Sequence, residues 1–159
     1  MAANETFRIE RSTVIDAPPQ AAFALVDDFH RWTAWSPWEK LDADLKRAYS
    51  GAASGVGAVY AWEGKKSGSG RMEIVTAEPA SRIVIKLDFI KPFAAHNTAE
   101  FTFAREGKRT RVTWAMSGPV TLMSKIMGIF FSTEKFVGPQ FEDGLANMKR
   151  VVQSEPAAA

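Results

Sequence analysis

The feature that most constrains how this chain folds is a strand-like alternation of apolar and polar residues, repeated several times in its central part. It is clearest in the segment 82–89, where isoleucine, leucine and phenylalanine recur at every second position. The segments 58–62, 99–103 and 112–116 alternate in the same way, and we expect a flexible hairpin loop at 64–70. One apolar and one polar face per strand predicts an antiparallel sheet that is covered on one side and runs as a meander.

The N-terminal part predicts a further strand and two short helices. Alternation over residues 7–15 indicates a strand, and the prolines that follow it start a helix over 20–28. The tryptophan-rich segment 30–40 predicts a second short helix followed by an irregular turn, and residues 45–50 predict an edge strand.

The cover for the sheet is predicted near the C-terminus. Phe141, Leu145, Met148 and Val152 follow one another at helical spacing, and polar residues occupy the other positions. Pro139 is expected in the first turn of this helix, where its missing N–H is tolerated. We expect the apolar stripe to pack against the sheet, facing Trp62 and Trp114.

Two residues interrupt these patterns. Gly144 lies inside the predicted helix, where it allows close contact between helix and sheet, helps to leave a void there, or does both. Arg11 shares the parity of the apolar residues in its strand. Either a bulge breaks that parity, or Arg11 reaches a partner or a polar ligand group inside the sheet.

Composition narrows the class of protein. The 159 residues are 46% hydrophobic and 24% charged, which suits a single globular domain over 1–159 with a core of about 6–153 and a frayed tail. The absence of cysteine excludes disulfides and a cysteine nucleophile, and it suits a reducing compartment. A net charge of +2 does not indicate a nucleic-acid partner. We see no signal peptide and no apolar run of membrane-spanning length, so we expect a cytoplasmic protein.

Several spaced blocks resemble the polyketide cyclase/dehydrase-like branch of the helix-grip (SRPBCC) superfamily, which also contains START lipid-transfer domains and the birch-pollen allergen fold. The resemblance runs in order through nearly the whole chain. The blocks are Trp32–Lys40, Tyr49–Gly51, Gly55–Gly64, Gly70–Ile74, Lys91–Phe93, Thr110–Met116 and Phe141–Lys149.

This resemblance implies an α+β helix-grip fold. Its expected parts are a curved seven-stranded antiparallel sheet, two short helices after the first strand, and a long C-terminal helix that grips the sheet. It also implies a cavity between sheet and helix for a hydrophobic ligand such as a lipid, sterol, polyketide or quinone.

The aromatic residues carry the best functional signal. Each one alone reads more simply as core, but together they exceed what one helix can cover, which favours a pocket. The residues that we expect to line the cavity are Trp35, Trp38, Tyr60, Trp62, Met72, Leu87, Phe89, Phe101, Trp114, Met116, Met127, Phe130, Phe141 and Leu145.

The segment 120–131 is a second apolar signal. Eight of its twelve residues are apolar, and it would extend only about 18 Å as a helix, too short to span a bilayer. It is interpreted as a piece packed over the sheet end, a mobile lid over the cavity mouth, or a patch that touches a membrane.

Few residues of the sequence are suited to general acid–base or nucleophilic catalysis. The two histidines, His30 and His96, read more simply as loop or surface residues, and they lack the spacing of a zinc site. No nucleophile elbow is present, and we expect neither a metal nor a cofactor. If a reaction is catalysed, the candidates are Arg11 as orienting donor, Tyr49 as acid and His96 as base.

Three functions therefore stay open: a carrier for a hydrophobic small molecule, a cyclase, aromatase or dehydratase, and a protein-interaction module such as a co-chaperone. The small number of acid–base candidates favours the carrier over the enzyme. The lack of a strongly charged surface disfavours the protein-interaction module. The expected partner is a hydrophobic small molecule, with no nucleic acid and no transmembrane segment. Transient membrane contact stays open, and we expect a monomer or weak homodimer.

Overall fold

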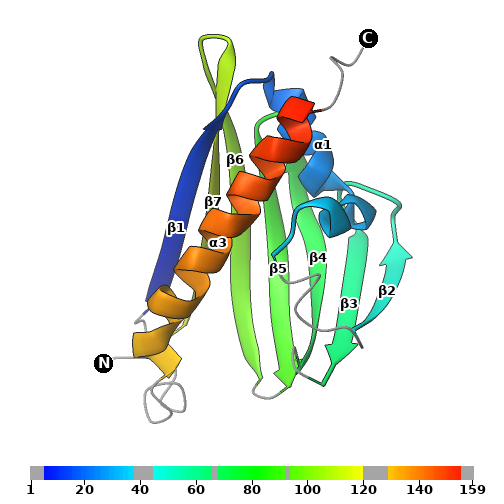
Figure 1. Cartoon of the computed structure of the whole chain (residues 1–159). Coiled ribbons are helices and arrows are strands. Elements are labelled where there is room, and N and C mark those ends of the chain that lie inside the picture. The colour runs from blue at the N-terminus through cyan, green and yellow to red at the C-terminus, as the bar shows by residue number, and fades with distance from the viewer. Residues whose placement is uncertain (1–5, 38–44, 66–67, 92–93, 120–128, 155–159) are drawn as a thin grey trace.

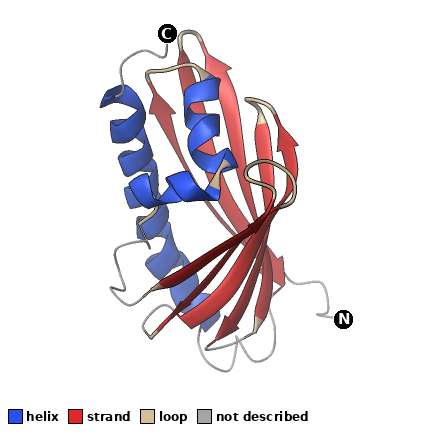
Figure 2. Ribbon diagram, turned by 90° about the vertical axis from the view of Figure 1, so that its right-hand side faces the viewer, coloured by secondary structure: helices blue, strands red, loops and turns tan. Residues whose placement is uncertain are grey.

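A computed structural model describes residues 6–37, 45–65, 68–91, 94–119 and 129–154. A curved seven-stranded sheet carries the described helices on one side, its inner face (Figures 1 and 2). The elements in chain order are β1 (Thr6–Ile15), α1 (Pro19–Asp27), the 3₁₀ helix η2 (Phe29–Ala34), β2 (Lys46–Gly51), β3 (Ala58–Gly64), β4 (Gly68–Glu78), β5 (Arg82–Lys91), β6 (Ala95–Glu106), β7 (Arg109–Pro119) and α3 (Ile129–Ser154).

The sheet is antiparallel throughout, in the order β1-β7-β6-β5-β4-β3-β2. Strands β2 to β7 form the expected meander, and β1 pairs with β7, so β1 and β2 lie at opposite edges. The pairing of β4 with β5 has two register shifts, at Ser69/Gly70 and Ile74/Thr76, and irregularities of this kind increase the local twist of a sheet. The helix-grip architecture predicted from the sequence is confirmed.

Helix α3 crosses the inner face beside β1 (Figure 1). Phe141, Leu145, Met148 and Val152 are buried, as the helical spacing predicts. The helix begins at Ile129, so the prediction that Pro139 stands in its first turn is wrong. Pro139 is an exposed interior residue, and the helix tolerates it with the loss of one backbone N–H donor.

Helices α1 and η2 are joined to each other by two buried tryptophans. The indole N–H of Trp32 donates to the carbonyl of Val26 at 3.0 Å, and that of Trp35 donates to Leu25 at 3.0 Å. These carbonyls belong to the last turn of α1 and have no partner within the helix. The tryptophans therefore satisfy the end of α1 while their rings fill the core.

One end of the inner face is a closed aromatic core. Trp114 stacks on Phe141 with ring centroids 4.0 Å apart, and Phe101 stacks on Trp114 at 5.0 Å. A Cβ on Gly144 would lie 2.9 Å from both Pro37 and Trp114, so this glycine permits close contact. The void suggested at Gly144 is absent, because these two side chains occupy the space. We call this region the upper core and define it as Trp32, Trp35, Phe101, Trp114, Phe141, Leu145 and Met148.

Candidate functional site

The other end of the inner face differs from the upper core in its cover. Helix α1 contacts β5, β6 and β7, η2 contacts β3, and α3 contacts β1 and β7. Figure 1 shows no helix in front of the lower halves of β3, β4 and β5. We call this region the lower inner face and define it as Tyr60, Trp62, Met72, Leu87, Phe89, Asn97 and Met116.

Strand register assembles the lower inner face from five strands, β3 to β7. Tyr60 is paired with Met72, Met72 with Leu87, and Leu87 with Asn97, which places these side chains in one row across the sheet. Trp62, Gly70 and Phe89 form the next row towards the strand ends. Side chains in a row share one face, so the alternation seen in the sequence produces a continuous, mostly apolar surface.

Gly70 determines how Trp62 lies. A Cβ on Gly70 would collide with the six-membered ring of Trp62, so the indole lies directly over the backbone of β4 at Gly70. The ring also meets Phe89 edge-on, with centroids 5.8 Å apart, and Trp62 stays partly exposed. The prediction of a flexible loop over 64–70 is therefore wrong at its end, since Gly70 is a buried strand residue. A glycine inside a strand often marks such a close approach.

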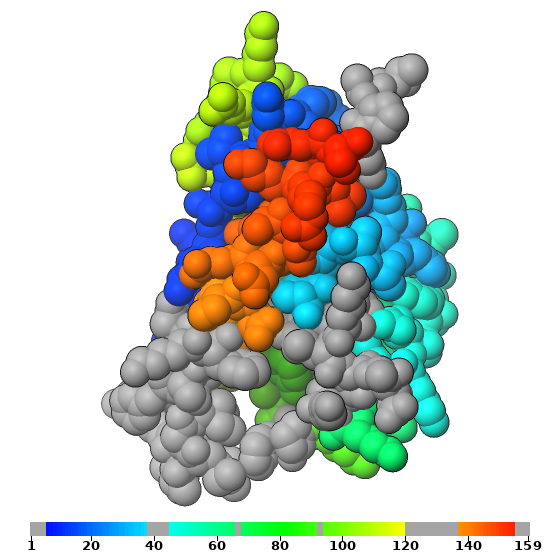
Figure 3. Space-filling model, viewed as in Figure 1, coloured from blue at the N-terminus to red at the C-terminus, as the bar shows by residue number. Residues whose placement is uncertain are grey.

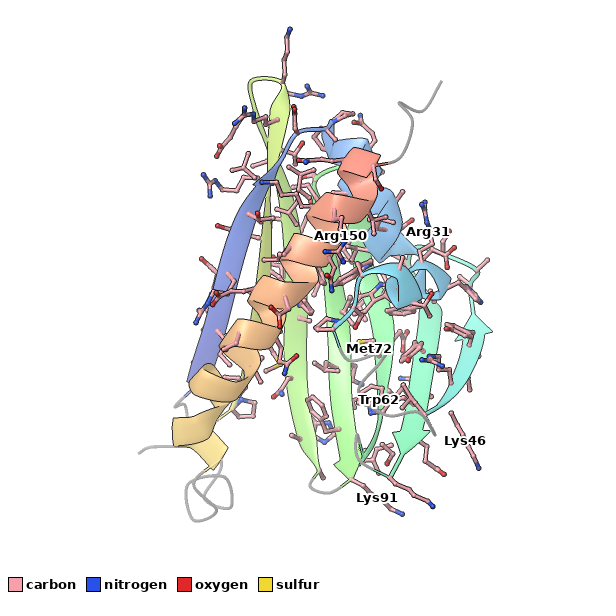
Figure 4. The ribbon with its side chains drawn as sticks, in the orientation of Figure 1. Arg31, Lys46, Trp62, Met72, Lys91 and Arg150 are labelled. Atoms are coloured by element: carbon pink, nitrogen blue, oxygen red, sulfur yellow. The ribbon has the colours of Figure 1, made fainter. Side chains whose placement is uncertain are left out.

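The expected cavity residues thus fall into two groups. Trp35, Phe101, Trp114, Phe141 and Leu145 are at most 2% exposed and pack within the upper core. Trp62, expected to face the C-terminal helix together with Trp114, lies on β3 away from α3, close to Met72 (Figure 4). Tyr60, Trp62, Met72, Leu87, Phe89 and Met116 lie on the lower inner face. Of these, Trp62 and Phe89 are partly exposed, and the other four are buried, at 5–9% exposure.

Part of the predicted lining lies outside the described residues. Trp38 and Met127 belong to segments that the structure does not describe, and the side chain of Phe130 is likewise outside it. The interpretation of 120–131 as a lid, a membrane contact or core therefore stays a prediction. Of that segment, residues 129–131 form the first turn of α3.

Arg11 keeps its inward parity. The register between β1 and β7 runs unbroken from Thr6 to Ile15, so the suggested bulge is absent. The guanidinium reaches α3, where Nε donates to Glu142 at 3.0 Å, and it lies against Gly138, whose missing side chain leaves it room. Arg11 therefore ties the edge strand to the gripping helix.

The structure does not bring Arg11, Tyr49 and His96 together. Tyr49 is on β2, at the sheet edge opposite to β1, and stacks on His30 with ring centroids 4.0 Å apart. His96 faces outward on β6, its side chain 78% exposed and 2.9 Å from Asp88. Since the three side chains occupy different edges and faces, they do not form one acid–base site.

Asp27 is the one described residue with a fully buried side-chain oxygen that lacks a hydrogen-bond partner. It ends α1, beside Gly55 of the loop between β2 and β3. Burial, with a smaller contribution from the neighbouring charge of Asp28, raises the pKa of its carboxyl. The negative charge also lies at a helix C-terminus, where the helix dipole disfavours it.

A surface groove of about 510 Å³ separates Pro37 from the exposed side of α3. Its lining is mostly polar, with Gln140, Asp143, Asn147 and Arg150. Asn147 donates to the carbonyl of Trp35 at 3.1 Å and accepts from Arg150 at 2.7 Å, so its polar groups already pair with each other. Figure 3 shows α3 lying against the α1–η2 region, with which it makes contacts. The groove suits an apolar ligand less well than the lower inner face does.

No described helix is long and apolar enough to cross a membrane. Within the described ranges, no three His, Asp or Glu side chains gather as a metal ion requires.

Solved structures share this fold at low sequence identity. The di-domain aromatase/cyclase BexL of the BE-7585A biosynthetic pathway superposes with a TM-score of 0.70 at 19% identity, covering 95% of this chain and 51% of BexL. The Aha1 dimer from Colwellia psychrerythraea gives 0.66 at 13% identity, covering 93% and 97%. SA2116 from Staphylococcus aureus, a protein of unknown function, gives 0.70 at 10%, covering 94% and 95%. At these identities the likeness shows the fold alone.

A search of curated proteins finds no match. A family profile, by contrast, matches nearly the whole sequence. The profile of one family, described as polyketide cyclase / dehydrase and lipid transport, matches residues 6–153. That range includes every described strand and almost all of α3, so the chain belongs to the polyketide cyclase / dehydrase and lipid transport family.

Proposed function

We propose that this protein binds a hydrophobic small molecule on the lower inner face. The observation that carries the proposal is the placement of Trp62, Met72 and Leu87 on a concave sheet surface that no described helix covers. The upper core, by contrast, has its aromatic rings stacked against α3. An apolar, concave surface with few polar groups is the usual form of a small-molecule site.

The side chains of this surface suit a flat or flexible apolar ligand. Trp62 and Phe89 offer ring faces and edges for stacking, and Trp62 is partly exposed. Met72 and Met116 are flexible and polarisable, so they adapt to ligands of different shape. The family's description names polyketides and lipids, which are largely apolar compounds and agree with this chemistry.

The direct test is binding of a neutral naphthalene dye such as prodan, followed by dye and tryptophan fluorescence. We expect micromolar affinity, corresponding to about −8 kcal/mol. Trp62→Ala should weaken binding at least about tenfold, because it removes a large apolar contact. Ile90→Ala is the matched control, since Ile90 is apolar but exposed, on β5 of the same sheet, and it should leave the affinity unchanged.

Two results would contradict the proposal. One is failure of the dye to bind the wild-type protein at concentrations up to about a hundred times the expected dissociation constant. The other is equal binding by wild type and Trp62→Ala, which would place the dye elsewhere.

A further inference from the structure

Asn97 is a buried amide on an otherwise mostly apolar surface. It lies on β6, in the same row as Leu87 and Met72, and is 9% exposed. Because the strand alternates, its neighbours His96 and Thr98 face outward and are exposed. A buried amide is costly unless its hydrogen bonds are made, so its partners matter.

The described partners of Asn97 satisfy only part of its amide. Nδ2 donates to the thioether sulfur of Met116 at 3.9 Å, a weak acceptor. Oδ1 has no hydrogen-bond partner among the described residues. The only fully buried and unpaired side-chain oxygen there belongs to Asp27, so Oδ1 of Asn97 still borders space that a solvent molecule can reach.

Gly118 on β7 makes room for this arrangement. A Cβ on Gly118 would collide with Oδ1 of Asn97, and its next neighbour would be the ring of Phe7. The amide therefore extends over the backbone of β7 and occupies the place where an inward side chain would stand. A glycine and a buried amide thus form one local arrangement that holds an acceptor oxygen on the inner face.

We propose that Asn97 is a specificity-determining residue that accepts a hydrogen bond from a hydroxyl group on an otherwise apolar ligand. This inference rests on the proposed function and names the substrate class of the same site. A hydroxyl fits because Oδ1 needs a donor. A cationic donor does not fit, because the lower inner face contains no carboxylate to pair with its charge.

The test compares two probes of nearly equal size, 2-naphthol and 2-methylnaphthalene, by displacement of the bound naphthalene dye. The wild type should bind 2-naphthol about tenfold more tightly, as one neutral hydrogen bond in a buried site allows. Asn97→Leu, which keeps the size and removes the amide, should abolish this preference while 2-methylnaphthalene still binds.

Two further variants separate specificity from folding. Gly118→Ala keeps the amide but pushes it aside, and it should also remove the preference. Thr98→Val is the matched control on the outer face of the same strand, and it should keep the wild-type ratio. Circular dichroism melts show which variants are folded, and either Asn97→Leu or Gly118→Ala alone decides the question.

The outcomes distinguish this inference from the proposed function. If both probes bind and a folded Asn97→Leu or Gly118→Ala variant keeps the wild-type ratio, the role of Asn97 is wrong and the apolar site stands. If the wild type binds the two probes equally, the role is likewise wrong. If neither probe displaces the dye, or the dye does not bind, the proposed site itself fails and the role of Asn97 falls with it.

Discussion

The upper core and the lower inner face share strands β6 and β7 and the same alternation, yet they differ in what covers them. In the upper core, α1, η2 and α3 meet over the sheet, and Trp114 lies stacked between Phe101 and Phe141. On the lower inner face, the ring of Trp62 lies over Gly70 of its own sheet. The comparison teaches that alternation alone does not distinguish a core from a binding surface, because the distinction depends on where the helices end.

The largest effect should come from truncating the gripping helix at its aromatic contact. Phe141→Ala removes a ring stacked on Trp114 at 4.0 Å and should lower the free energy of unfolding by about 3–5 kcal/mol. Trp62→Ala should cost roughly half as much, because Trp62 is partly exposed. Urea denaturation measures both. Equal losses would remove the distinction between the two regions.

A smaller effect should follow from filling the close contact at Gly144. The added methyl of Gly144→Ala would lie 2.9 Å from Pro37 and Trp114, and overpacking of this kind costs about 1–3 kcal/mol. Improved helix propensity returns at most about 1 kcal/mol, so a net loss is expected in urea denaturation. The control is Ala146→Ser, because Ala146 is exposed on the same helix and the added hydroxyl creates no such close contact. A stabilised Gly144→Ala variant would mean that space does remain between helix and sheet.

Much of the fold could be predicted from sequence because strand and helix periods are local. The stripe from Phe141 to Val152 and the alternation of β5 and β6 lead directly to buried side chains. The start of α3 could not be found in this way, since Pro139 resembles an N-terminal signal. The polar candidates failed for a different reason, because sheet order separates Arg11 from Tyr49 and local patterns do not contain sheet order.

Asn97 was missed although the sequence did carry a signal for it. It continues the inward parity of Ala99 and Phe101, so the same alternation that places those residues inside also places an amide inside. Its proposed role depends on Gly118 of the neighbouring strand β7, which leaves room for the amide. Local patterns do not show which residues of β6 and β7 lie side by side, because that is set by the strand register.

The smallest expected effect concerns Asp27, beside the upper core. Because burial raises the pKa of this carboxyl in the folded state, the folded protein binds the proton more tightly than the unfolded chain does. Its contribution therefore makes the protein more stable as the pH falls from neutral through the folded-state pKa, and this gain levels off below the unfolded-state pKa. Asp27→Asn should raise the melting temperature at pH 7 and remove this part of the pH dependence. A lower melting temperature at pH 7 would show that the charged carboxylate is stabilising.

The most direct test of the two-region account is a methyl NMR titration of methionine-labelled protein with 2-naphthol. Met72 and Met116 lie on the lower inner face, while Met148 is fully buried in the upper core. The account predicts that the methyl signals of Met72 and Met116 shift with saturable, matching affinity and that the Met148 signal stays in place. A Met148 shift as large as that of Met72, or a titration that moves neither Met72 nor Met116, would contradict it.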